Sequence, residues 1–201
     1  MRRVGLFGGT FDPPHAGHLA IAEWAREQLG LDRVVFMPAG TPPHKRRRDL
    51  SSAATRLAMT RLALRGRPGF CAWTLETRRR GPSFTVDTLR HLRRRFRDAR
   101  LYLILGADSL DDLRNWQEPG EIVKLATLAV APRPGISLSR ASRGATFSLR
   151  RRGVVRLEGP ALAVSSSAIR ARVRAGRPLG DRVPEAVARY IRRHRLYRNG
   201  A

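Results

Sequence analysis

Short apolar runs alternate with stretches of helical periodicity along most of the chain. Runs of aliphatic, aromatic and β-branched residues predict strands at residues 4–7, 33–37, 70–77, 101–105, 127–131 and 154–157. Stretches with a period near 3.6 residues predict helices at 16–30, 52–64, 85–96, 167–175 and 184–194, with helical turns over 109–125. Because strands alternate with helices, the expected fold is α/β: a Rossmann-like parallel sheet with helices on both faces.

The first predicted helix has the clearest apolar face. Ile21, Trp24, Ala25 and Leu29 lie on one side of it, and Gly30 suits the left-handed conformation that ends many helices. In parallel sheets covered on both faces, ligands bind beyond the carboxyl ends of the strands. The loops that lead from strands into helices are therefore where functional residues are expected.

The length and composition set limits on the class of protein. A chain of 201 residues is expected to form a single domain over residues 1–201, with residues 165–201 as a C-terminal helical part packed on the sheet. The one cysteine excludes an internal disulfide framework. The longest unbroken apolar runs have seven residues, far fewer than the roughly 20 that a membrane-spanning helix needs. No secretory signal is readable, so we expect a cytoplasmic protein without a membrane partner.

The charge balance is strongly basic and has two explanations. Lys and Arg number 40 against 16 Asp and Glu, a formal net charge of +24. An excess of this size is the electrostatic footprint of nucleic-acid binding. However, all but Lys45 and Lys124 of the basic residues are arginine, a bias that GC-rich codon usage produces without any partner. The charge alone leaves both explanations open.

A glycine-rich turn joins the first predicted strand to the first helix. It has the sequence Gly8-Gly9-Thr10-Phe11-Asp12-Pro13-Pro14-His15-Ala16-Gly17-His18. Two glycines at a strand end let backbone N–H groups approach a phosphate, and the helix start adds unpaired N–H groups with a partial positive charge. The turn lacks both the Gly-Lys-Ser/Thr of a Walker A loop and the third glycine of the dinucleotide fingerprint.

The two histidines of this turn are three residues apart and share one side of the first helical turn. As metal ligands, His15 and His18 are short of the three or four that a zinc site needs. As purely structural residues, they would cap or pack the helix. As hydrogen-bond donors, they would stabilise negative charge that builds on phosphate in a transition state. We favour the third interpretation because the neighbouring Gly-Gly-Thr turn also suits phosphate.

This turn resembles the signature of the nucleotidylyltransferase superfamily, whose His-x-Gly-His element binds a nucleotide triphosphate. The superfamily's second element, Ile-Ser-Ser-Thr-x-Ile-Arg, is similar to Val164-Ser165-Ser166-Ser167-Ala168-Ile169-Arg170. Valine and serine replace isoleucine and threonine at Val164 and Ser167. We expect Ser167 to cap the helix that it opens, and Arg170 to offer a planar pair of donors to phosphate. The two elements lie about 150 residues apart.

Further segments resemble the bacterial nicotinate mononucleotide adenylyltransferase family, and the similarity runs over nearly the whole chain. These segments are Thr41-Pro42-Pro43-His44-Lys45, Phe84-Thr85-Val86-Asp87-Thr88-Leu89, Gly106-Ala107-Asp108 with Trp116, Arg133-Pro134-Gly135, and Val183-Pro184-Glu185-Ala186-Val187 with Tyr190-Ile191 and Leu196-Tyr197. Thr85, at a predicted helix start, suits an anion such as the nicotinate carboxylate, although a simple N-cap is an equally natural role. Trp116 suits stacking on a pyridine ring or a place in the core, and Asp108 suits a ribose hydroxyl.

The resemblance implies a reaction in which ATP and nicotinate mononucleotide give nicotinate adenine dinucleotide and pyrophosphate. It implies His15, His18 and Arg170 as the catalytic residues. The implied ATP-binding set is Gly8, Gly9, Thr10, Phe11, His15, His18, Gly106, Asp108, Ser166, Ser167 and Arg170. The implied residues for the mononucleotide are Lys45, Thr85, Trp116 and Arg133. Mg²⁺ would bind mainly through the phosphates of ATP, with no metal-ligand set expected from the protein.

Three alternatives accompany this prediction. Phosphopantetheine adenylyltransferase shares the first motif but lacks the Pro-Pro-His-Lys and Thr-x-Asp-Thr elements. A preference for the amidated mononucleotide would depend on backbone donors that a sequence does not display. A nucleic-acid-binding module would show a steep dependence of affinity on salt. The sequence leaves the oligomeric state open.

Overall fold

The computed structural model describes residues 1–42, 50–132, 153–160 and 162–198. Within these ranges, one parallel sheet contains six strands in the order β3-β2-β1-β4-β5-β6. The strands are β1 (Arg3–Gly9), β2 (Arg33–Pro38), β3 (Phe70–Ala72), β4 (Arg100–Gly106), β5 (Thr127–Ala131) and β6 (Val154–Arg156). The order reverses between β1 and β4, which places a topological switch point at the carboxyl ends of these two strands.

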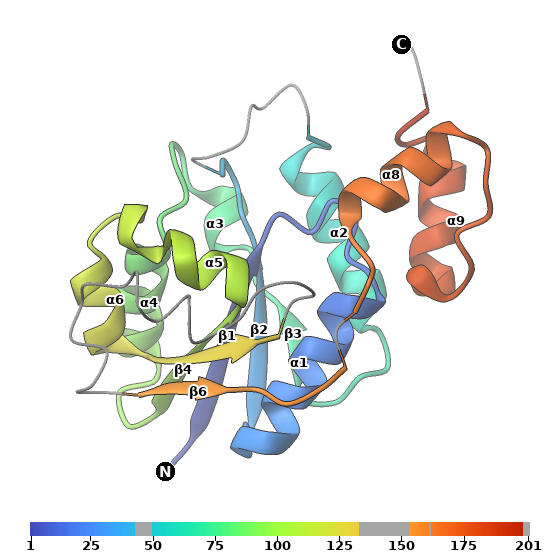
Figure 1. Cartoon of the computed structure of the whole chain (residues 1–201). Helices are drawn as coiled ribbons and strands as arrows, with labels where there is room; N and C mark the ends of the chain where they lie inside the picture. The colour runs from blue at the N-terminus through green and yellow to red at the C-terminus, as the bar shows by residue number, and fades with distance from the viewer. Residues whose placement is uncertain (43–49, 133–152, 161, 199–201) are drawn as a thin grey trace.

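Helices cover both faces of this sheet, as the sequence predicts (Figure 1). They are α1 (Ala16–Leu29), α2 (Ala53–Leu64), α3 (Leu75–Arg78), α4 (Thr85–Arg95), α5 (Ala107–Asp112), α6 (Pro119–Leu125), α8 (Ser166–Arg174) and α9 (Glu185–Arg193), with 3-10 turns η2 (Leu113–Asn115) and η4 (Gly180–Arg182). The Rossmann-like fold class is therefore confirmed. In the described ranges, no helix has the length and the hydropathy that a membrane crossing requires.

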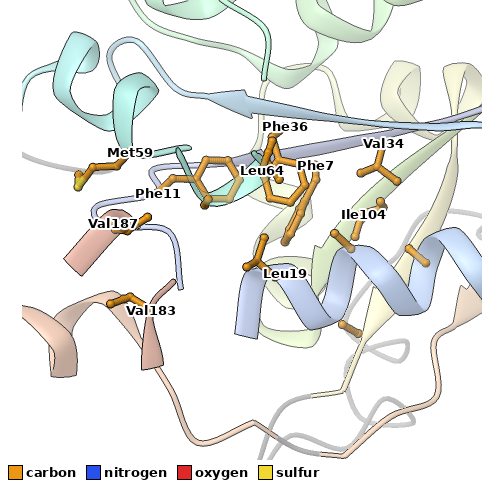
Figure 2. Packing of buried hydrophobic residues seen from close by; sticks show 14 of the residues in the cluster. Phe7, Phe11, Leu19, Val34, Phe36, Met59, Leu64, Ile104, Val183 and Val187 are labelled. Carbon is orange, nitrogen blue, oxygen red and sulfur yellow. The ribbon is translucent and has the colours of Figure 1, made fainter. Parts of the chain in front are cut away.

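Alternate residues of each strand point to opposite faces and form two apolar layers. Phe7, Phe36 and Ile104 pack under α1 and α2 (Figure 2), whereas Leu6 and Leu103 pack under α4, α5 and α6. Because both layers are closed by helices, the central strands are apolar on both faces. This explains the unbroken apolar runs that predict them.

Two local predictions differ from the structure. The strand predicted at 70–77 ends at Ala72, and Leu75–Arg78 forms the short helix α3 instead, closed by a bond from Arg78 N to Thr74 O. On α1, Ile21 and Trp24 are only half-buried, while the smaller Ala22 and Ala25 are completely buried. The helix therefore approaches the sheet through alanines, and its larger side chains lie at the edges of the contact.

The C-terminal helices lie beside α2 in Figure 1. Helix α9 contacts α2, and the turn η4 contacts α1. Val183, Val187 and Ile191 extend the apolar layer that contains Phe11 and Met59 (Figure 2). Apolar packing thus continues from the sheet through α2 into this part of the chain, while the single-domain organisation of residues 1–201 stays a prediction.

Candidate active site

A cleft of about 490 Å³ opens at the switch point between β1 and β4. The carboxyl end of β1 supplies Gly8 and Gly9, and the end of β4 supplies Gly106. The remaining walls include Thr10, His18, Ile21, Ala39, Pro42, Glu76, Ser83, Phe84, Thr85, Asp108, Ser109, Asn115, Trp116 and Gln117. The structure thus brings together at one cavity predicted residues that are far apart in the sequence.

The two glycines of the first turn have different structural roles. A Cβ atom on Gly8 would meet nothing within 4 Å, so its position leaves room for a ligand beside the backbone. A Cβ atom on Gly9 would lie 2.9 Å from the ring of Phe11. Phe11 is itself 1% exposed, so its side chain belongs to the core, and only its backbone can contact a ligand.

His15 and His18 cap the start of α1 reciprocally. The backbone N–H of His18 donates to Nδ1 of His15 (3.3 Å), and that of His15 donates to Nδ1 of His18 (3.2 Å). The two rings stack with centroids 3.6 Å apart. Because each Nδ1 accepts a hydrogen bond, the neutral rings carry their protons on Nε2.

This arrangement reconciles two of the interpretations drawn from the sequence. Capping uses Nδ1, so any contact of these rings with a phosphate would have to be made by Nε2. His18 lines the cleft. The ring of His15 stacks on the ring of His18, and His15 is 7% exposed. The described residues include no group of three or more His, Cys, Asp or Glu side chains that could hold a metal ion.

Gly17 sits between the two motifs. A Cβ atom there would lie 2.8 Å from Cγ1 of Val164 and 3.1 Å from Nδ1 of His15. Any larger residue would therefore push the first residue of the C-terminal motif away from the His15 ring. The glycine of the His-x-Gly-His element is explained by this close approach.

The C-terminal motif contacts the first motif through hydrogen bonds to its backbone. The hydroxyl of Ser166 donates to the carbonyl of Pro13 (2.9 Å), and Nη1 of Arg170 donates to the carbonyl of Asp12 (2.8 Å). The predicted cap at Ser167 is wrong by two residues, because Ser165 accepts from the N–H of Ala168 and α8 starts at Ser166. Ser167 is exposed and lies 3.4 Å from Nη2 of Arg170.

The opposite side of the cleft contains three residues predicted from the sequence. Thr85 is the first residue of α4; the cap position is Phe84, and no side chain caps the helix. Trp116 is half-buried and donates through Nε1 to Oδ2 of Asp112 (3.3 Å), which fixes the plane of its ring. Asp108 is exposed in the first turn of α5. The predicted Lys45 and Arg133 lie outside the described residues.

Sequence reasoning missed Arg56, a buried arginine that joins two loops of the cleft. It is 1% exposed, and its guanidinium donates to the carbonyls of Ser51 (3.0 Å), Thr10 (2.9 Å) and Gly40 (3.0 Å). Burial lowers the pKa of Arg56, although nearby Asp12 opposes the shift. The signal was present in the sequence, because Arg56 falls on the apolar stripe of its helix, where a charged side chain is unusual.

A second missed residue is Glu76, a carboxyl group in the wall of the cleft. It is 6% exposed and accepts a hydrogen bond from the Thr88 hydroxyl (2.6 Å). Burial raises its pKa from 4.5 to about 7, against the opposing influence of Thr88, Arg79, Ser83 and Arg56. Glu76 was missed because it falls within the strand predicted at 70–77. The pattern of a strand does not indicate a helical turn that buries a carboxyl group.

Together, the parallel sheet, the switch-point cleft and the histidine-capped glycine turn define an α/β nucleotide-binding protein. The family model described as Cytidylyltransferase-like matches residues 6–172. A Plasmodium falciparum nicotinic acid mononucleotide adenylyltransferase complexed with NaAD has the same fold, with a TM-score of 0.81 and 17% identity over 98% of both chains.

Curated relatives are much closer in sequence. A probable nicotinate-nucleotide adenylyltransferase from Thermomicrobium roseum is 48% identical over 98% of this chain and 92% of its own length. One from Herpetosiphon aurantiacus is 43% identical over 98% of this chain and 99% of its own length. The chain belongs to the nicotinate-nucleotide adenylyltransferase family, within the cytidylyltransferase-like nucleotidyltransferases.

Proposed function

We propose that the protein transfers the adenylyl group of ATP to nicotinate mononucleotide, giving nicotinate adenine dinucleotide and pyrophosphate for NAD biosynthesis. The relatives from Thermomicrobium roseum and Herpetosiphon aurantiacus are both named as probable nicotinate-nucleotide adenylyltransferases. The observation that supports the proposal best is the meeting of the two motifs at Asp12 and Pro13, beside the switch-point cleft. At this junction the guanidinium of Arg170 is held at the Asp12 carbonyl, three residues before the paired histidines that cap α1.

The triphosphate of ATP would lie along the glycine-rich turn. Gly8, Gly9, Thr10 and the backbone of Phe11 would admit it closely, and His18 with the stacked His15 would donate from Nε2. Arg170 would hold the β- and γ-phosphates with Ser166 and Ser167 nearby, and Gly106 and Asp108 would contact the nucleoside. Donors fixed in place before the reaction stabilise charge that develops on phosphate oxygens, which accounts for a large share of catalysis in such sites.

The mononucleotide would occupy the wall formed by α4 and η2. The first N–H groups of α4 have no side-chain cap, so they and Thr85 are suited to the carboxylate of nicotinate. Trp116 would stack on the pyridine ring, in the plane that Asp112 fixes. Lys45 and Arg133 stay predicted phosphate contacts.

The chemistry requires no general base from the protein. One oxygen of the mononucleotide phosphate attacks the α-phosphorus of ATP, a new P–O bond forms, and the bond from that phosphorus to the bridging oxygen breaks as pyrophosphate leaves. The attacking phosphate is already mostly dianionic near pH 7, because its second pKa is about 6. The protein therefore acts by in-line positioning and by charge stabilisation.

We propose that Mg²⁺ arrives at this site with the phosphates of ATP. The described residues provide no cluster of three or more acidic, histidine or cysteine ligands, and Mg²⁺ commonly keeps its waters and binds phosphate oxygens. When bound, it neutralises part of the charge of the triphosphate. We propose no metal ligand among the protein's own residues.

One assay separates this proposal from its alternatives. Pyrophosphate release from ATP is measured with nicotinate mononucleotide, with its amide and with phosphopantetheine, each with and without competing RNA. We expect turnover with the nicotinate form and no effect of RNA at physiological salt. Pyrophosphate release with phosphopantetheine but with neither mononucleotide would contradict the proposal. Inhibition by RNA that weakens steeply as the salt concentration rises would contradict it as well.

A further inference from the structure

The C-terminal segment returns to the first motif through one tyrosine. Beyond α9, the N–H of Leu196 bonds to the carbonyl of Ile191 (3.1 Å), and Arg195 and Tyr197 have φ angles of 49° and 63°. Residues other than glycine rarely adopt this left-handed conformation, which persists only where surrounding contacts impose it. Here it directs the Tyr197 hydroxyl to Oδ1 of Asp12, at 2.6 Å.

Asp12 connects this tyrosine to Arg170. It is 1% exposed, and its Oδ2 accepts the N–H of Ser51 (3.0 Å). Its backbone carbonyl accepts Nη1 of Arg170 (2.8 Å). The side chain of Asp12 therefore binds the C-terminal segment while its backbone binds the arginine of the second motif.

The Tyr197 hydroxyl is a permanent donor. Burial, followed by the charge of Asp12, raises the pKa of Tyr197 far above its usual range, although Arg170 opposes the shift. The tyrosine thus satisfies Oδ1 of Asp12 without contributing a positive charge. Arg170 forms no ion pair with any carboxylate of the described chain, although its guanidinium is held next to Asp12 by the bond to that residue's backbone carbonyl.

Loss of the tyrosine hydroxyl would leave a buried carboxylate oxygen without its donor, and the nearest cation would move to it. Two arginines are close to Asp12. Each nitrogen of Arg56 already donates to a carbonyl, so this guanidinium is fixed. Arg170 is half-buried, and its guanidinium donates only to the carbonyl of Asp12 and the hydroxyl of Ser167. It is therefore the arginine whose side chain can rotate toward the Asp12 carboxylate.

We propose that Tyr197 is a positioning residue: by occupying the Asp12 carboxylate, it keeps the guanidinium of Arg170 directed toward the phosphates of the nucleotide. The inference rests on the proposed function, since it assumes that Arg170 binds the triphosphate. It assigns to the C-terminal segment a role at the active site, at a distance of 185 residues along the sequence from Asp12.

The test compares Tyr197→Phe with Tyr190→Phe in the full chain. Phenylalanine keeps the ring, which packs against the apolar layer containing Met59, and removes the hydroxyl with its contacts to Asp12 Oδ1 (2.6 Å) and Met59 Sδ (3.7 Å). Tyr190 is half-buried on α9, and its hydroxyl has no hydrogen bond to any described residue, which makes it a matched control. For Tyr197→Phe, we expect kcat/KM for ATP and the affinity for inorganic triphosphate, measured by calorimetry, both to fall about tenfold. KM for the mononucleotide should not change, and neither should any parameter of Tyr190→Phe.

A second substitution provides a rescue. Asp12→Asn in the Tyr197→Phe background removes the charge that would attract Arg170, so most of the lost triphosphate affinity should return. A lower melting temperature for Tyr197→Phe with unchanged kcat/KM and unchanged triphosphate affinity would overturn the inference, as would a loss that Asp12→Asn does not restore. If the wild type transfers no adenylyl group, the proposed function fails, and triphosphate affinity still decides the role of Tyr197.

Discussion

Glu76 allows a direct test of how the cleft is built. Its carboxyl group is 6% exposed and accepts from the Thr88 hydroxyl, so Glu76→Gln keeps the shape and the accepting oxygen while it removes the charge. Burial raises the pKa of Glu76 from 4.5 to about 7. The folded chain therefore holds a proton that the unfolded chain releases at lower pH.

The size of the effect follows from this difference in proton affinity. Below pH 4.5 the carboxyl is protonated in both states and contributes no penalty; above about pH 7 it is ionised in both, and the folded state carries the full cost of burying the charge. Each tenfold change in proton affinity corresponds to about 1.4 kcal/mol, so ionisation costs the folded chain about 3 kcal/mol. Stability due to this group is thus lost as pH rises from 4.5 to about 7.

The measurement is urea unfolding of the wild type and Glu76→Gln at a series of pH values from 4.5 to 8. We expect the two proteins to be similar at pH 4.5 and the variant to become more stable by about 3 kcal/mol at pH 8. Glu27→Gln, on the exposed side of α1, serves as the control for the exchange of a carboxylate by an amide in water. A difference between wild type and Glu76→Gln that stays constant with pH, or that favours the wild type at pH 8, would refute the reasoning.

Three further substitutions test the site. His18→Ala removes an Nε2 donor from the cleft and should lower kcat by roughly 10²–10³ with an unchanged fold by circular dichroism, whereas unchanged turnover would contradict its role. Gly17→Ala forces a Cβ atom to within 2.8 Å of Val164 and 3.1 Å of His15; we expect lower kcat and a loss of about 1–3 kcal/mol in urea unfolding. Trp116→Ala should raise KM for the mononucleotide about tenfold by loss of stacking, and an effect on KM for ATP alone would move Trp116 to the other subsite.

The sequence predicts the layout of this fold well because its central strands are buried on both faces and therefore stand out as apolar runs. The edge strand β3 is where the prediction was wrong: Phe70–Ala72 pairs with β2 on one side only, and the chain then turns into α3. Aromatic and β-branched residues extend past the strand, so composition overestimated its length. Position in the sheet, which a single sequence does not give, decides where such a strand stops.

The motifs by themselves determined the chemical class of the site: a glycine turn, two histidines at helical spacing and a distant serine-rich helix start with an arginine. Only the tertiary structure decided how these parts depend on one another. Histidine Nδ1 atoms cap α1, Arg56 joins two loops through their carbonyls, and Tyr197 reaches Asp12. The physical reason is that a pattern along the chain records which groups can donate or accept, whereas burial and long-range hydrogen bonds select the partner that each group meets.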